Sequence, residues 1–510
     1  MSAARLCALG AMGLVIGVAG CTMEPHYERP AAPVAKAWPE GPAFSKPAEP
    51  GESMQAPAPE IGWRDFFADA RLQQLIAVAI AHNPDARIAA FNIIAARSQY
   101  HIQRADLFPT VAASAVEQVE KYPAAVAGIA TGGVGGTGSI TAVNSGSKVF
   151  RYFDAGVGFT SYEIDLFGRV RSLNHQRLQQ YFGYVETRRS TQISLVAEVA
   201  NAYLSMLADR ELLRITQDTL KSQQDSLSLV QMSFDGGVAT ALDLHQAETT
   251  VATARASLAQ YTRQVAQDEN ALVLLLGTPL PADLPPGAAL DEEQMLAKLP
   301  EGLPSDLLTR RPDILAAEHN LLAANANIGA ARAAFFPRIT LTGNYGTAST
   351  QLSGLFDHGS TAWTFSPQIS LPIFAGGANV ASLQLAKAQK NIYVVQYEQA
   401  IQTAFREVAD ALAGRGTLDE QIAADQALVN STSESYRLSD MRFHSGVDNF
   451  LSVLDSQRSL FSAQQQLVAV KLARLQNLVT LYKALGGGWL ERGEPNIAPT
   501  ADAANTRPQD

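Results

Sequence analysis

The chain has 510 residues, of which 47% are hydrophobic and only 17% charged, and its formal net charge is −10. That charged fraction lies below the roughly 25% typical of soluble domains, and the chain is too long for one ordinary core. The basic residues are scattered along the sequence. This argues against a nucleic-acid partner, because binding to nucleic acid needs clustered Lys and Arg.

The N-terminus predicts a lipoprotein signal peptide over residues 1–20. A basic residue precedes the apolar stretch Leu6 to Ala19, which is too short to span a bilayer as a helix. The run Val18-Ala19-Gly20-Cys21 resembles a bacterial lipobox, and the alternative is an unmodified Cys beside an ordinary cleavage site. Cys7 lies within the signal, so the mature chain offers no disulfide partner. We therefore predict acylation of Cys21 and no other cofactor.

Residues 21–62 predict a Pro-rich tether that joins the lipid anchor to the body. Nine prolines fall between residues 22 and 60, and such a segment favours an extended polyproline conformation and is not expected to pack. Thr22, rather than Asp, follows the Cys, as is usual in lipoproteins of the outer membrane. No later stretch is apolar enough for a transmembrane helix, so a membrane location requires the lipid or a β-barrel.

The body of the chain is an internal repeat. Residues 63–277 and 312–485 predict two structural repeats, joined by an inter-repeat equatorial segment over 278–311 and followed by a flexible C-terminal tail over 486–510. The matching motifs are Asn83-Pro84-Asp85 with Arg311-Pro312-Asp313, and Leu276-Gly277 with Leu485-Gly486. The two pairs differ in spacing, which predicts an insertion in the Gly-rich stretch between Lys121 and Val149.

Each repeat predicts a helix, then two strands, then two long helices separated by glycine. The first half has helix 85–107, β-hairpin 109–166 and helical hairpin 168–276; the second has helix 312–335, β-hairpin 337–373 and helical hairpin 378–485. Apolar residues recur every seven positions in the long helices, which predicts coiled-coil packing. They alternate with polar residues in the strands. Pro367 within the fourth strand predicts a bulge.

Helix lengths and strand number together predict an assembly. At about 1.5 Å per residue, helix 168–234 spans roughly 100 Å, close to the length of helices 239–276 and 85–107 stacked end to end. Four strands cannot close in lipid, where an open edge leaves backbone groups unpaired. Two chains would give a small barrel that its own side chains fill, whereas three would leave room for a passage. The pattern therefore favours a trimer.

Six motifs follow one another along the mature chain. They are Pro25-x-Tyr27-x-Arg29-Pro30, Trp63-x-x-Phe66-Phe67, Tyr162-x-x-Asp165-Leu166-Phe167-Gly168, Leu371-Pro372-Ile373-Phe374-x-Gly376-Gly377, Ser445-Gly446-Val447-Asp448-Asn449 and Leu481-Tyr482-Lys483-Ala484-Leu485-Gly486-Gly487-Gly488-Trp489. In this order and spacing they resemble the TolC-like outer-membrane factor family, in the lipoprotein branch (the OprM/NodT type) of tripartite RND efflux systems.

The resemblance implies a fold, a function and partners. The fold would be mainly α with a β-barrel: a TolC-like homotrimer whose 12-stranded outer-membrane barrel, four strands per chain, continues into a long periplasmic α-helical barrel. It would join a periplasmic adaptor (membrane fusion) protein and an inner-membrane RND-type pump. The assembly would give drugs and other small molecules a passive exit duct from the periplasm, lipid-anchored in the cell outer membrane with a periplasmic extension.

The resemblance also implies two candidate sites. The turns Gly236-Gly237-Val238 and Ser445-Gly446-Val447 would form periplasmic tips that dock the adaptor, or they are turns and nothing more. Family members often narrow the tip with acidic residues, so one of Asp425, Glu434 and Asp440 would line a gate. The alternative is that these carboxylates belong to a solvated helix face.

No residue pattern indicates catalysis or a metal site. Gly132-Gly133-Val134-Gly135-Gly136 lacks the Lys and the strand-to-helix setting of a phosphate loop, and predicts an extracellular loop. The eight histidines show no zinc-ligand spacing, and no nucleophile motif occurs, so we expect no enzyme. Two other functions remain open: a type I secretion exit duct for polypeptides, and a structural coiled-coil lipoprotein of the envelope.

Overall fold

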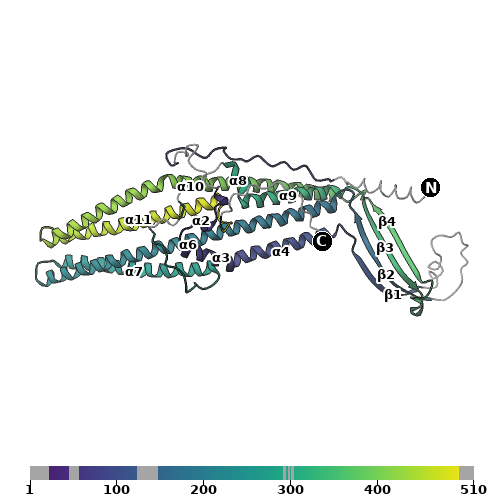
Figure 1. The fold of residues 1–510 in the computed structure, drawn as a ribbon, viewed down its shortest axis with the longest axis horizontal. Helices are drawn as coiled ribbons and strands as arrows, with labels where there is room; N and C mark the ends of the chain where they lie inside the picture. The colour runs from purple at the N-terminus through teal and green to yellow at the C-terminus, as the bar shows by residue number, and fades with distance from the viewer. Residues whose placement is uncertain are drawn as a thin grey trace. The chain divides into compact units, whose positions relative to one another are not determined.

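The computed structural model describes residues 22–44, 57–122, 148–290, 295–296, 299 and 304–492 (Figure 1). The helices are η1 (Ala58–Glu60), α2 (Trp63–Phe66), α3 (Ala70–His82), α4 (Pro84–Ala105), α6 (Arg169–Asp235), α7 (Ala241–Leu276), α8 (Pro304–Arg310), α9 (Pro312–Ala333), η2 (Leu352–Gly354), α10 (Ala378–His444) and α11 (Phe450–Ala484). The strands are β1 (Val111–Tyr122), β2 (Lys148–Ile164), β3 (Arg338–Ser349) and β4 (Thr361–Ser370). The predicted signal peptide, Cys21 and the glycines of 132–136 lie outside the described residues.

The predicted repeat of helices is confirmed. The helices α4, α6, α7, α9, α10 and α11 begin and end within two residues of the expected bounds. The helix α3 was not predicted, although its sequence carries two signals. Its buried residues Leu72, Leu75, Ile76 and Ala79 recur at helical spacing. The side chain of Asp69 caps its start and accepts from the backbone N–H groups of Arg71 and Leu72. Across the described part of the chain, we find no helix that combines the length and the hydropathy needed to cross a membrane.

The four strands form one antiparallel sheet in the order β1-β2-β3-β4. The predicted bulge at Pro367 is wrong, because β3 and β4 keep one register throughout and Pro367 lies directly opposite Leu341. As the outer strand of the sheet, β4 has N–H groups that point away from β3, and a proline is tolerated there. The irregularity lies instead in β2, between Phe159 and Tyr162, where Ser161 has a φ of 57°.

The chain folds into two compact units, each of which draws on both sequence halves. Of the described residues, the first unit comprises 22–29, 95–122, 148–181 and 320–393 and contains the sheet. The second comprises 30–44, 57–94, 182–290, 295–296, 299, 304–319 and 394–492. In the second unit α7 runs back beside α6, and α11 beside α10 (Figure 1). Arg210 pairs with Glu269 across the first hairpin at 2.9 Å, and Arg474 with Asp419 across the second at 2.5 Å.

Within the second unit, helices stack end to end as predicted. The side-chain amide of Asn83, just before α4, donates to the carbonyl of Leu275 in the last turn of α7 at 2.9 Å. Arg311, just before α9, donates to the carbonyl of Ala484 at the end of α11 at 2.9 Å. The last carbonyls of a helix have no partner within it. The residue before each proline therefore satisfies one of them and joins two helices into one rod.

The prediction that the Pro-rich segment does not pack is wrong for residues 22–44. The segment has no helix or strand, as its prolines require. In the first unit, however, Asn325 donates to the carbonyl of Pro25 at 2.8 Å. In the second unit, Trp38 stacks on Phe405 of α10 with ring centroids 5.1 Å apart. An extended segment leaves its carbonyls and the side chains between its prolines free for such contacts.

The prediction of a flexible C-terminal tail is wrong for residues 486–492. The backbone N–H of Trp63 donates to the carbonyl of Leu490 at 3.0 Å, and that of Arg64 to the carbonyl of Glu491 at 3.1 Å. These N–H groups open α2 and have no acceptor within it, so the tail provides one. The remainder of the predicted tail, residues 493–510, lies outside the described residues.

Candidate functional site

The first tip closes α6 with a Schellman C-cap. Val238 donates its N–H to the carbonyl of Ser233 at 2.8 Å, and Gly237 donates to Phe234 at 2.9 Å. Gly237 has a φ of 75°, the left-handed conformation that this cap needs and that glycine adopts without strain. Gly236 precedes the cap and is still helical, since its N–H donates to the carbonyl of Met232 at 3.0 Å.

The second tip repeats this cap after α10. Val447 donates to the carbonyl of Arg442 at 3.0 Å, and Gly446, with a φ of 74°, donates to Phe443 at 2.9 Å. Arg442 also forms an exposed two-point ion pair with Asp448, at 2.6 and 2.9 Å. That hydrogen bond holds the pKa of Asp448 below its ordinary value. The two turns therefore have a fixed backbone.

The two hairpins pack together just below the tips. Their shared apolar cluster consists of the buried residues Val230, Leu244, Ala247, Phe450 and Val453. Val238 and Val447 do not take part in it, and their side chains are 86% and 63% exposed. An apolar side chain that the fold does not bury is available to a partner. The assignment of these tips as docking surface remains a prediction.

The three candidate gate residues all lie on α10 but are not brought together. Glu434 accepts from Arg437 at 2.5 Å, which lowers the pKa of Glu434, and Asp440 lies 3.6 Å from the ring of His444. One oxygen of Asp425 is buried without a hydrogen bond from the described residues. Within the same ranges, no group of three or more His, Cys, Asp or Glu is arranged to hold a metal ion. Asp425 is thus the one of the three with an unsatisfied oxygen.

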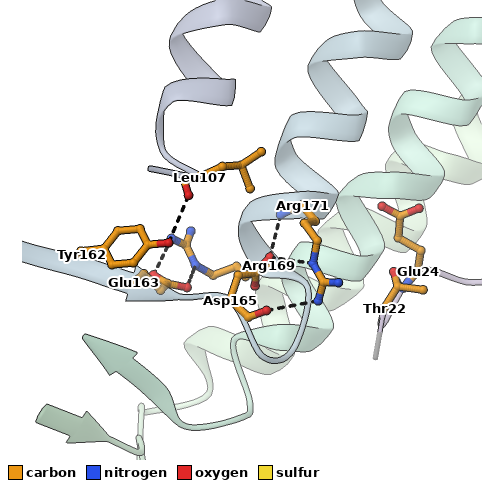
Figure 2. Close-up of polar contacts among 8 residues, drawn as sticks. All are labelled: Thr22, Glu24, Leu107, Tyr162, Glu163, Asp165, Arg169 and Arg171. Atoms are coloured by element: carbon orange, nitrogen blue, oxygen red, sulfur yellow. Dashed lines mark hydrogen bonds and ion pairs between the residues drawn. The ribbon is translucent and has the colours of Figure 1, made fainter. Parts of the chain in front are cut away.

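A second polar site lies in the first unit, where the strands meet the helices (Figure 2). Arg169, at the start of α6, donates through Nε and Nη2 to the two carboxylate oxygens of Glu163 in β2, both at 2.8 Å. Arg171 donates its backbone N–H to Asp165 at 2.8 Å and its Nε to the same oxygen at 3.2 Å. The hydrogen bonds that Arg169 donates to Glu163 raise the pKa of Arg169. These pairs fix how α6 leaves β2.

Part of this junction belongs to a family motif for which the sequence alone indicated no structural role. The hydroxyl of Tyr162 donates to the carbonyl of Leu107 at 3.1 Å (Figure 2), and Gly168 turns the chain with a φ of 76°. Tyr162, Asp165 and Gly168 belong to one sequence motif. These residues fix the passage from strand to helix. The sequence signal for that role is the change from the alternating pattern of β2, which ends at Ile164, to a helix that begins at Arg169.

The described chain combines two antiparallel helical hairpins with matched C-caps and a four-stranded sheet whose two outer strands have no partner among the described strands. This combination is that of a TolC-like outer-membrane channel. The chain belongs to the outer membrane efflux protein family, whose model matches residues 75–278 and 303–487. The predicted family is thereby confirmed.

The chain is also similar to named efflux proteins and to a solved channel. It is 49% identical over 492 residues to the antibiotic efflux pump outer membrane protein ArpC of Pseudomonas putida, and equally to the toluene efflux pump outer membrane protein TtgC of the same species; each match covers 96% of this chain and 97% of the relative. The open state of the MtrE outer membrane channel of Neisseria gonorrhoeae matches with a TM-score of 0.81 and 39% identity, over 93% of this chain and all of that one. The predicted fold class, efflux function and outer-membrane location are confirmed.

Proposed function

We propose that three copies of the chain form a continuous passive duct through which small organic molecules leave the periplasm. The observation that supports this is the sheet. Tyr345 lies opposite Trp363 on the face where apolar residues of β3 and β4 recur, and the two side chains are 67% and 70% exposed. Val157 continues the row on β2 beside Tyr345 and is also exposed. An uncovered apolar face that crosses neighbouring strands fits contact with lipid.

The open edges of the sheet support three copies. Within the described residues, strands β1 and β4 each have one side without a partner strand, and lipid does not tolerate such an edge. If β4 of one copy pairs with β1 of the next, the interface is heterologous and closes into a ring. Three copies supply twelve strands. Exposed apolar residues on α4, namely Ile88, Phe91 and Ile94, offer a helical surface for the neighbouring copy.

The tips support an adaptor as partner, and through it an inner-membrane pump. Each copy presents Val238 and Val447 on rigid turns, so a trimer would present six such turns. Such turns suit binding to an apolar helical surface of a periplasmic partner. Because the turns are already rigid, little conformational entropy is lost when the valines are buried. Acylation of Cys21 would add a lipid anchor to the assembly.

The cargo is proposed from the relatives. ArpC is named for antibiotics and TtgC for toluene, so this chain would serve small organic molecules of both polar and apolar kinds. A duct need not recognise its cargo chemically, and we expect no catalytic turnover. A defined turnover that disappears with a single side-chain substitution would contradict this part.

The test is to delete the gene from its host and measure cellular accumulation of an antibiotic and of an apolar dye. We expect accumulation to rise several-fold and to return to its original level when the wild-type chain is restored. If accumulation is unchanged while a polypeptide disappears from the medium, the duct serves protein secretion instead. If neither changes on deletion, although the parent strain carries the protein in its outer membrane, the proposed function is wrong.

A further inference from the structure

The loop that joins β3 to β4 displays two large apolar side chains. Leu352 is 66% exposed and Phe356 is 79% exposed. The loop lies at the end of the sheet away from α9 and α10, because β3 begins directly after α9 and β4 leads back to α10 (Figure 1). The two side chains, four residues apart in one turn, therefore form an apolar surface that the described chain leaves largely uncovered.

The loop binds many of its backbone N–H groups internally. Gln351 donates its N–H to Oγ of Ser349 at 3.2 Å. Further along, the N–H groups of Gly354, Leu355 and Asp357 donate to the carbonyls three residues earlier, at 3.1, 3.3 and 3.3 Å. Hydrocarbon offers no partner to a backbone N–H group. A turn that binds these groups itself can therefore contact lipid without leaving them unpaired.

The side chain of Ser349 shows toward which face of the sheet the loop turns. Strand residues alternate between the two faces, so Ser349 shares a face with Tyr345, four positions earlier in β3. A Cβ at Gly354 would lie 2.9 Å from Ser349 Oγ, so the turn lies against this side chain. Phe153, opposite Ser349, is only 9% exposed, whereas Val157 further along the same face is 54% exposed. The loop therefore turns onto the apolar face of the sheet.

We propose that the β3–β4 loop is a membrane-contacting element, whose Leu352 and Phe356 side chains enter the acyl region of the leaflet at that end of the sheet. This rests on the proposed function, in which the face of Tyr345 and Trp363 contacts lipid. Because the loop turns onto that same face, the surface it displays is continuous with it and meets the same lipid. Asp357 directly follows Phe356 and stays among the head groups. Apolar and charged residues of one loop thus fix the depth of the sheet in the membrane.

Spin labels on the mature channel, reconstituted into vesicles of phosphatidylethanolamine and phosphatidylglycerol, test this. Collisions of the label with oxygen report lipid, and collisions with a water-soluble nickel chelate report water. We expect the oxygen-to-nickel collision ratio to be several-fold higher for Leu352→Cys and for Phe356→Cys than for His358→Cys, the matched control at an exposed polar residue of the same loop. The mature chain has no cysteine besides Cys21, and the chain without an added cysteine measures any label that Cys21 takes up.

A label at Tyr345→Cys separates the loop contact from the proposed function. A high ratio there, with ratios at Leu352→Cys and Phe356→Cys no higher than at His358→Cys, overturns the loop contact and leaves the sheet in lipid. A water-like ratio at Tyr345→Cys contradicts the proposed function itself. Loop labels that collide with neither reagent are covered by a neighbouring copy, which also overturns the loop contact. Both loop side chains are exposed, so their replacement removes no packing within the chain, and either variant alone decides.

Discussion

At the scale of single residues, two carboxyl groups meet between α6 and α7. Burial, and then the hydrogen bond and the charge of Asp268, raise the pKa of Asp209 to about 7. Asp268 has a buried oxygen that accepts nothing from the N–H and hydroxyl groups of the described residues, so a protonated Asp209 is the donor it needs. The adjacent Arg210 and Glu269 are already paired with each other at 2.9 Å. Asp209 is therefore mostly protonated below about pH 7, where it can donate to Asp268.

This pair predicts a pH dependence of stability. Because the pKa of Asp209 is higher in the folded chain than the 3.8 of the free group, its stabilising effect is full below about pH 4 and is lost as the pH rises through 7. Asp209→Asn keeps a donor toward Asp268 but cannot ionise. We expect it to raise the melting temperature at pH 8 by on the order of 2 °C and to change it little at pH 4.5.

Thermal unfolding at the two pH values measures this. Asp225→Asn, an exposed carboxylate on the same helix, is the matched control and should shift the melting temperature equally at both. If Asp209→Asn also shifts it equally at pH 4.5 and pH 8, the two carboxyl groups do not share a proton.

At the scale of elements, substitutions at the two tips test whether these turns also form a docking surface. Val238→Asp with Val447→Asp leaves both Schellman caps intact, because these caps use backbone groups and the glycines at 237 and 446. We expect normal trimer yield and outer-membrane delivery but loss of efflux, since a charge replaces the exposed apolar contact. Drug susceptibility and trimer yield are measured on the same cells.

The double Val→Thr variant is the control, because threonine keeps the branched shape without a charge. It should retain most of the resistance. Wild-type resistance in the double Asp variant would exclude the tips as docking surface, and loss of the trimer itself would show that the valines serve only the fold.

The helices were predictable because the internal repeat gives the same heptad pattern twice. The ends of the long helices follow from heptads that stop at glycine, and both copies agree. The bulge at Pro367 was wrong because sequence alone did not place β4 at the edge of the sheet. The contacts of Asn83 and Arg311 were not predicted, although both residues stand before a proline in matching motifs, because their acceptors are carbonyls 192 and 173 residues away in the sequence.

At the scale of the whole molecule, the order and spacing of the motifs predicted the class and the strand number favoured a trimer, while the packing of the two terminal segments was missed. The prolines indicate that residues 22–44 form no helix, but they do not indicate that Asn325 and Arg332 of α9 donate hydrogen bonds to the carbonyls of Pro25 and Met23. Likewise, the sequence of residues 486–492 does not indicate that their carbonyls accept hydrogen bonds from the first N–H groups of α2. Contacts that use backbone groups leave little trace in a single sequence.

Native mass spectrometry of the channel purified in detergent tests most directly whether three copies of the chain assemble into one closed duct. The open edges of β1 and β4 among the described strands predict a dominant species of three chains, retained when the tip valines are changed. A wild-type sample that contains only monomers or dimers would contradict the account.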